Sequence, residues 1–353
     1  MKTWMMIILA GLLAADAQAH PGHAHASPRP SQVQAQRVVL GSGAQAFASV
    51  PGWCQVDEGE HLGPTHGSVA VDSAGLIYVT LDAGEVGIAV YNAQGEFVRG
   101  MAGDFVGTHH LIYHEEDGTG YLYGAHLKGK QVYKLTLEGE TVWTLGLPEE
   151  SGKYENAGQY KPTAVAVGPD GDLYIVDGYG QNWVHQYDKD RNYIRSFGGR
   201  GREDGQFTTC HGIAIDPRGE EPRLLICDRE NRRLQYFDLE GNFLSISTTD
   251  LYRPCAVSFF GEYCAVAELA GRVVVLDGDN EIISVLGDNP VDDRRANYRV
   301  DPEDWAEGIF NAPHGLSYDN EGNLIVLEWN QWGRVTFLEH LDEADAPAPE
   351  PAD

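Results

Sequence analysis

Apolar and polar residues alternate along most of the chain in short runs that end at turns rich in Asp, Asn and Gly. Alternation with a period of two on both sides of such a turn is typical of β-hairpins. Five copies of this pattern are clear: VYNAQGEFV from Val90, KLTLEGETV from Lys134, QYDKDRNYI from Gln186, YFDLEGNFL from Tyr236 and VLDGDNEII from Val275. The pattern therefore predicts an all-β protein built from antiparallel strands.

A second pattern accompanies the hairpins and consists of a strand of small residues, a DxxG-type turn and a second strand. Its copies align at one position near the start of the first strand, and the mean spacing of about 50 residues suits a four-stranded propeller blade. Six aligned positions predict a six-bladed β-propeller. The aligned residues are His66, His109, Thr163, His211, Cys255 and His314.

The last repeat is incomplete. After HGLSY it offers only LIVLEW and VTFLEH before the chain becomes acidic. A propeller whose last blade lacks an outer strand can be closed by a strand from the other end of the chain. We expect the segment near Arg37 to Leu40 to supply that strand and close the ring.

The two ends are expected to lie outside the propeller. Met1–Ala19 has the apolar run and the small-residue Ala-Gln-Ala site of a signal peptide, and Asp16 ends the run too early for a membrane helix. We therefore expect a secreted or periplasmic protein without membrane insertion. A flexible His- and Pro-rich linker is expected at 20–36, the propeller at 37–340 and a disordered acidic tail at 341–353.

The net charge limits the possible partners. The chain has 25 Lys and Arg against 53 Asp and Glu, which gives a formal charge of −28. Nucleic acids and anionic membranes require a basic surface, so neither is expected as a partner. A small molecule or peptide at the mouth of the central channel remains the expected substrate.

Three of the aligned positions are histidines in alternate blades: His109, His211 and His314. Alternate blades of six are related by about 120°, so the three imidazoles would converge on the axis. Three histidines with an open fourth position suit catalytic zinc, although imidazoles can also simply fill a polar channel. His66 is a weaker candidate because its segment is one residue longer. His110 competes with His109, since adjacent strand residues face opposite ways.

The second strands bring further polar groups to the same mouth. Tyr179 lies in DGYGQN, and Arg229 lies in DREN. A tyrosine beside a metal and a guanidinium can have its pKa lowered from about 10 and then act as a base. The alternative is that both residues make hydrogen bonds or ion pairs between blades. Turn capping is favoured for Asp177 and Asp228.

These motifs resemble the NHL-repeat propellers, and among them the catalytic domain of peptidyl-α-hydroxyglycine α-amidating lyase. The likeness is strongest in YKPTAVAVGPDGDLYIVDGYGQNWVHQYD, in FTTCHGIAIDPR with LICDRENRRLQYF, and in FNAPHGLSYDNEGNLIVLE. The resemblance implies zinc on His109, His211 and His314, with Tyr179 as the base and Arg229 in support. It also implies cleavage of the N–C bond of a peptidyl α-hydroxyglycine to a peptide amide and glyoxylate.

Two positions depart from that family. It uses an arginine from the first blade, where this chain has LDAGEVG from Leu81, and it commonly has methionine where this chain has Ala312. Two other functions therefore stay open. One is a non-catalytic propeller that recognises a peptide or glycan. The other is a calcium-dependent, lactonase-type hydrolase with Glu328, Asp228 and Asn231 as available ligands, which three axial histidines disfavour.

Overall fold

The structure is a computed structural model that describes residues 36–56, 61–342 and 344–347. The signal peptide expected at 1–19 lies outside these residues, and so does the linker up to residue 35. Of the acidic tail expected at 341–353, residue 343 and residues 348–353 also lie outside them. Within the described part, the strands run from Val39 to His340.

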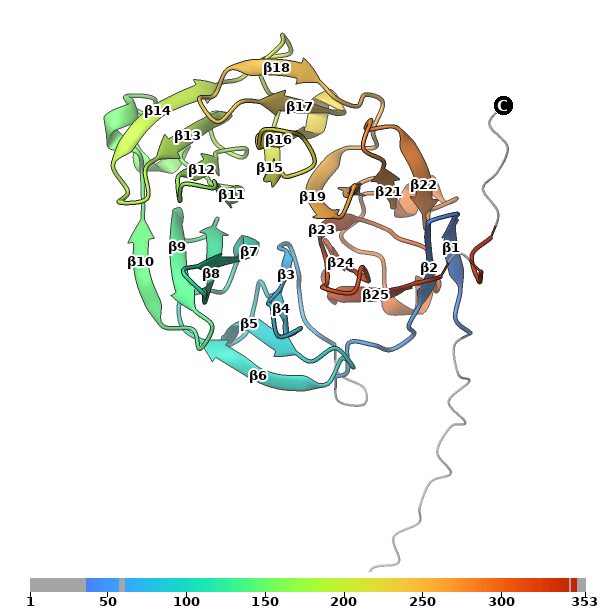
Figure 1. Cartoon of the computed structure of the whole chain (residues 1–353). Coiled ribbons are helices and arrows are strands. Elements are labelled where there is room, and N and C mark those ends of the chain that lie inside the picture. Colours follow the sequence, from blue (N-terminus) through green and yellow to red (C-terminus); the bar gives the residue numbers. More distant parts are fainter. Residues whose placement is uncertain (1–35, 57–60, 343, 348–353) are drawn as a thin grey trace, which may run out of the picture. The chain divides into compact units, whose positions relative to one another are not determined.

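Six antiparallel sheets form a ring, with β3, β7, β11, β15, β19 and β23 innermost (Figure 1). Each of these inner strands contacts the inner strand of both neighbouring sheets, so the ring is closed. The predicted all-β, six-bladed propeller is thereby confirmed. The first three blades are β3 (Val69–Val71), β4 (Ile77–Thr80), β5 (Val86–Tyr91) and β6 (Phe97–Ala102); β7 (Thr108–Glu116), β8 (Thr119–His126), β9 (Gln131–Thr136) and β10 (Thr141–Leu145); and β11 (Ala164–Val167), β12 (Leu173–Val176), β13 (Trp183–Tyr187) and β14 (Tyr193–Gly198).

The fourth and fifth blades have the same order of strands, and the sixth has five strands. They are β15 (Cys210–Asp216), β16 (Arg223–Asp228), β17 (Arg233–Phe237) and β18 (Phe243–Ile246); β19 (Pro254–Phe260), β20 (Tyr263–Glu268), β21 (Arg272–Leu276) and β22 (Ile282–Leu286); and β23 (Pro313–Tyr318), β24 (Leu324–Glu328), β25 (Arg334–His340), β2 (Gln45–Ser49) and β1 (Val39–Ser42).

Helical structure in the described residues is confined to five short 3₁₀ turns: η1 (Glu149–Ser151), η2 (Ala157–Gln159), η3 (Arg229–Asn231), η4 (Asp292–Arg294) and η5 (Pro302–Asp304). Among those residues, no helix has the length and apolar character needed to cross a bilayer.

The turns of the repeat explain why Asp and Asn recur in the sequence. In several of the hairpin turns, one side-chain oxygen accepts hydrogen bonds from backbone amides two and four residues further on. Asp188 Oδ1, for example, accepts from the amides of Asp190 at 2.9 Å and Asn192 at 2.8 Å. Such Asx turns satisfy backbone donors that the strand ladder leaves free. The same arrangement occurs at Asn92, Asp277 and Asp319.

The strand that completes the last blade is not the one expected. β2 pairs with β25, with Phe47 opposite His340, and it occupies the fourth position that we expected near Arg37–Leu40. β1 folds back over β2 as a fifth strand. The reason is burial: all five residues of β2 are buried, whereas Val39 in the more apolar RVVL segment remains 47% exposed.

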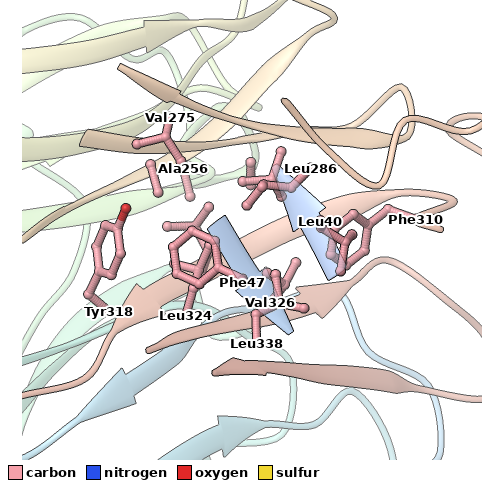
Figure 2. Packing of buried hydrophobic residues seen from close by; sticks show 14 residues of the cluster. Leu40, Phe47, Ala256, Val275, Leu286, Phe310, Tyr318, Leu324, Val326 and Leu338 are labelled. Carbon is pink, nitrogen blue, oxygen red and sulfur yellow. The ribbon is translucent and has the colours of Figure 1, made fainter. Parts of the chain in front are cut away.

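Phe47 connects the fifth and sixth blades from the N-terminal side. Its ring is fully buried in a cluster with Leu324 and Leu338 of the last blade and Val275 of the fifth (Figure 2). Close contact in this region also requires a glycine. Gly41 has a φ of +75°, and a Cβ there would lie 2.3 Å from Ser284 Oγ. The N-terminal strands therefore pack into the wall between two blades.

We expect Phe47→Ala to lower the free energy of unfolding by about 3–5 kcal/mol, because it removes a fully buried ring and leaves a cavity. Phe97→Ala is a suitable control: this side chain lies on an outer strand and is 56% exposed. Its change should stay within about 0.5 kcal/mol. Denaturant unfolding of the two variants measures the difference, and equal losses would contradict the role given to Phe47.

Candidate metal centre

Inner strands of alternate blades carry the three predicted histidines. His109, His211 and His314 are each the second residue of their strand, in β7, β15 and β23 respectively. At each of them the pairing with the next strand is interrupted by a β-bulge, so the histidine has no partner across the ladder. Bulges redirect side chains. Here they direct the three imidazoles toward the channel axis.

The three imidazoles lie close together and are almost fully buried. Their ring centroids are 4.7–4.8 Å apart in every pair, and each residue is at most 3% exposed. The convergence expected from the spacing of about 50 residues is therefore present in the fold.

Each Nδ1 atom is fixed by a backbone carbonyl of the next blade. The partners are the carbonyl oxygens of Thr163 for His109 at 2.7 Å, of Cys255 for His211 at 2.8 Å and of Gly67 for His314 at 2.9 Å. A carbonyl only accepts, so Nδ1 carries the proton and Nε2 keeps a lone pair.

Two of these Nε2 atoms have no hydrogen-bond partner. Within the described part of the chain, Nε2 of His109 and Nε2 of His314 are both buried and unpaired. Buried polar atoms are rarely left without a partner unless a ligand, ion or water completes the site. The arrangement is thus a set of preformed nitrogen donors.

Burial keeps these imidazoles neutral. It lowers the pKa of His109, His211 and His314 well below 6.5, and the charge of Arg229 lowers the pKa of His211 further. Neutral imidazole is the form that binds metal ions.

Tyr179 lies over the histidines and is held by three polar contacts. Its hydroxyl is 3.0 Å from His211 Nε2 and 3.2 Å from His66 Nε2, and it accepts a hydrogen bond from Arg229 Nη1 at 3.0 Å. Asp177 fixes the loop, because its carboxylate accepts from the backbone amides of Lys161 and Gln181, both at 2.6 Å. The structure therefore brings Tyr179 and Arg229 to the predicted site.

The pKa of Tyr179 depends on burial and on its charged neighbours. In the protein alone, burial raises it to about 12, and Arg229 offsets only part of this effect. The cost of removing a phenolate from water thus exceeds the attraction of one guanidinium. The lowered pKa expected beside a bound metal stays a prediction. Arg229 is itself shared with a carboxylate, since its Nε donates to Glu230 at 2.9 Å.

His66 belongs to the site although its longer segment made it the weaker candidate. Its ring centroid is 4.9 Å from that of His109 and 4.7 Å from that of His314. The neighbouring Thr65 forms an isolated antiparallel bridge with Asn330, which brings His66 back to the mouth. No local pattern predicts such a bridge, so only the alignment of the repeats pointed to His66.

The competing residues lie elsewhere. His110 lies beside the trio, but its Nδ1 is 3.4 Å from the amide nitrogen of Val165 in the next blade. The possible calcium ligands are used in blade structure: Asp228 pairs with Arg233 at 2.7 Å and Glu328 with Arg334 at 3.0 Å. Imidazole nitrogens suit zinc, copper or nickel better than calcium.

Cys255 is a second residue whose role the sequence did not reveal. Its ligand atom and those of His211 and His314 lie within 4.8 Å of one another. Burial raises the pKa of this thiol to about 11, which disfavours the thiolate. Cys255 occupies the aligned position in its blade, so its place in the ring was foreseen but its chemistry was not.

Behind the histidines, the inner strands line a cavity of about 310 Å³. Apolar side chains such as Leu111, Val165 and Ile213 line it together with polar ones such as His114 and Ser317. The channel therefore continues past the histidines as a pocket of mixed polarity.

A ring of six blades with buried imidazoles converging at one channel mouth defines a β-propeller with a histidine centre. No protein-family model matches the chain. It is 31% identical to NHL repeat-containing protein 3 of Mus musculus over 243 residues, which cover 62% of this chain and 68% of that protein. The chain belongs to the NHL-repeat proteins, as its motifs indicated.

Two further relatives agree with this assignment. Over 225 residues, the chain is 30% identical to NHL repeat-containing protein 3 of Homo sapiens, covering 60% of this chain and 64% of that protein. It is 25% identical to the probable peptidyl-alpha-hydroxyglycine alpha-amidating lyase pgal-1 of Caenorhabditis elegans over 223 residues, 60% of this chain and 59% of that protein. The chain thus matches about three fifths to two thirds of the length of these relatives.

Among solved structures, a streptogramin B lyase superposes with a TM-score of 0.55 and 12% identity, covering 86% of this chain and 97% of that one. At this identity the similarity shows the propeller fold alone.

The neutral histidines give the protein a defined response to acid. In the unfolded chain they titrate near 6.5, so below that pH the unfolded state binds more protons than the folded state. In the presence of a chelator, we expect the free energy of unfolding to be level above about pH 7.5. Below 6.5 it should fall by about 1.4 kcal/mol per pH unit for each histidine that stays neutral. Urea titrations across this range measure the slope.

His211→Gln removes one of these groups and should reduce that slope by about one proton. Identical slopes for the variant and the wild-type protein would show that His211 is not held neutral by the fold.

Proposed function

We propose that this NHL propeller is an exported zinc protein that cleaves the N–C bond of peptidyl α-hydroxyglycines, releasing a peptide amide and glyoxylate. The observation that carries the proposal is the set of three buried imidazoles whose ring centroids lie 4.7–4.8 Å apart. Their Nδ1 atoms are bound to backbone carbonyls, which leaves each Nε2 with its lone pair. The similarity to a probable amidating lyase of Caenorhabditis elegans supports the same chemistry.

The residues fit zinc both in the type of donor atom and in the hydrogen bonds that orient the imidazoles. His109, His211 and His314 would hold the ion through Nε2, and the carbonyl bonds at Nδ1 are the outer support that metal-binding histidines usually have. When bound, zinc would supply a Lewis acid that polarises a substrate oxygen. Calcium is disfavoured as the cofactor because no carboxylate lies among these donors.

Tyr179 is the proposed base, and Arg229 is its electrostatic support. Tyr179 would take the proton of the substrate hydroxyl while the C–N bond breaks and the C–O bond becomes a carbonyl. The leaving nitrogen then gains a proton and becomes the peptide amide. Arg229, with Nη1 3.0 Å from the phenol oxygen, favours the phenolate that this role requires.

The departures from the amidating lyases affect the first blade most. No arginine replaces the missing one in LDAGEVG, but Arg253 of the fifth blade also lowers the pKa of Tyr179. Arg253 reaches the site through Glu230, which accepts hydrogen bonds from both Arg229 and Arg253. We propose that this Arg–Glu–Arg group supplies positive charge to the mouth from the other side of the ring.

We expect purified protein to contain about one zinc per chain, because one set of three imidazoles suits one four-coordinate ion. His211→Ala should lose the metal, whereas His114→Ala should keep it, since His114 lines the other end of the channel. Elemental analysis after dialysis measures both variants. Wild-type protein that binds no zinc would refute the metal centre.

Glyoxylate release from an α-hydroxyglycine peptide tests the reaction itself. Tyr179→Phe should retain zinc and lose about 10²–10⁴-fold in kcat, the usual contribution of a positioned base. Tyr113→Phe, which removes a phenol that bonds Ser73 on the far strands, should keep full activity. Zinc-loaded wild-type protein without glyoxylate release would exclude the lyase and favour a propeller that only binds a peptide or glycan.

A further inference from the structure

We propose that His66 supplies a fourth imidazole to the metal, so that the resting centre is a four-histidine site. This inference rests on the proposed metal centre and adds a ligand from the first blade. All four positions of a tetrahedral ion would then be taken by imidazoles of this chain.

The positions of the donor atoms carry the proposal. The ligand atoms of His66, His109 and His314 all lie within 4.8 Å of one another. Two of them, Nε2 of His109 and Nε2 of His314, are buried and unpaired in the described residues. In a tetrahedral zinc site with Zn–N near 2.0–2.1 Å, donor atoms are about 3.4 Å apart. Movements of about 1 Å by the side chains would bring His66 into this set.

His66 lies beside Tyr179 and two of the three histidines. Its ring is 5.9 Å from that of Tyr179, at an interplanar angle of 21°, and 4.9 Å and 4.7 Å from those of His109 and His314. His66 therefore belongs to the same cluster of rings at the channel mouth.

The backbone on both sides of His66 is held by the last blade. Thr65 donates its hydroxyl to the carbonyl of Glu328 at 2.7 Å, and Gly67 accepts from His314 Nδ1 at 2.9 Å. Gly67 permits this close packing, because a Cβ there would lie 1.8 Å from Thr80 Oγ1. His66 is therefore placed by a rigid support, as metal ligands generally are.

His66 is the least firmly held of the four imidazoles. It is less buried than the other three, and its Nε2 lies 3.2 Å from the hydroxyl of Tyr179. The other three imidazoles are each fixed at Nδ1 by a backbone carbonyl. Of the four, His66 would therefore be the ligand with the most freedom to move.

Cys255 is the competing fourth ligand, because its ligand atom lies within 4.8 Å of those of His211 and His314. Its thiol already has polar partners, because it lies 3.7 Å from the carbonyl oxygen of Arg253 and is hydrogen-bonded to Arg229. Ligation would also require a thiolate in a buried position. We therefore assign the fourth position to His66.

X-ray absorption of the zinc-loaded, substrate-free protein counts the imidazoles directly. We expect four in the wild-type protein and three in His66→Gln. A count of three in the wild-type protein would overturn the proposal and leave His66 as a hydrogen-bond partner of Tyr179. The wild-type count decides the question even if the variant fails to fold.

Chelator competition gives a second readout. His66→Gln should bind zinc at least about 10-fold more weakly than the wild-type protein, since even outer supports of a metal site contribute 10–100-fold. His114→Gln is the matched control and should bind as the wild-type protein does. Equal affinity of His66→Gln and wild type would contradict ligation by His66.

Two outcomes separate this inference from the proposed function. If His211→Ala loses zinc while His66→Gln retains full affinity, the metal centre stands and the fourth ligand is refuted. If cobalt-substituted protein shows a sulfur-to-cobalt charge-transfer band, the fourth ligand is Cys255 and His66 is excluded. Wild-type protein that binds no metal refutes both.

Discussion

Closure of the ring is the constraint on which everything else in this protein depends. The ring closes because β2, from the N-terminal side, completes the last blade and the chain then continues directly into the first blade. Phe47 makes this strand part of the core between the fifth and sixth blades. Three histidines in alternate blades meet at one point only when the ring has six blades and is closed. The histidine centre is therefore a property of the whole fold, and no single blade contains it.

The sequence predicted those features that repeat and missed those that occur once. Turn chemistry and the spacing of about 50 residues identify the blades, and the same spacing places His109, His211 and His314 on the axis. Alternation could not decide between His109 and His110, because a β-bulge interrupts the alternation at that residue. The choice between two candidate N-terminal strands depended on which one buries its side chains, and pairing across the ring decides that.

His66 shows a second limit of prediction from the sequence. Its place depends on a bridge between Thr65 and Asn330, residues that are distant in the chain and have no recognisable pairing motif. The pKa of Tyr179 shows a related limit: the nearby charge can be read from the motifs, but the depth of burial, which raises the pKa, cannot. Local pattern thus identifies candidate side chains, while their environment follows from contacts between blades.

The hydrogen bonds at Nδ1 have a mechanical consequence. His109 joins the second blade to the third, His211 joins the fourth to the fifth, and His314 joins the sixth to the first. Each bond crosses a different junction, and together they group the six blades into three pairs. A ligand held by all three Nε2 atoms would tie these pairs together at the centre of the ring. Binding of such a ligand would then be coupled to the cooperative unfolding of the whole propeller. Its loss would weaken the connections between the three pairs of blades at the same time.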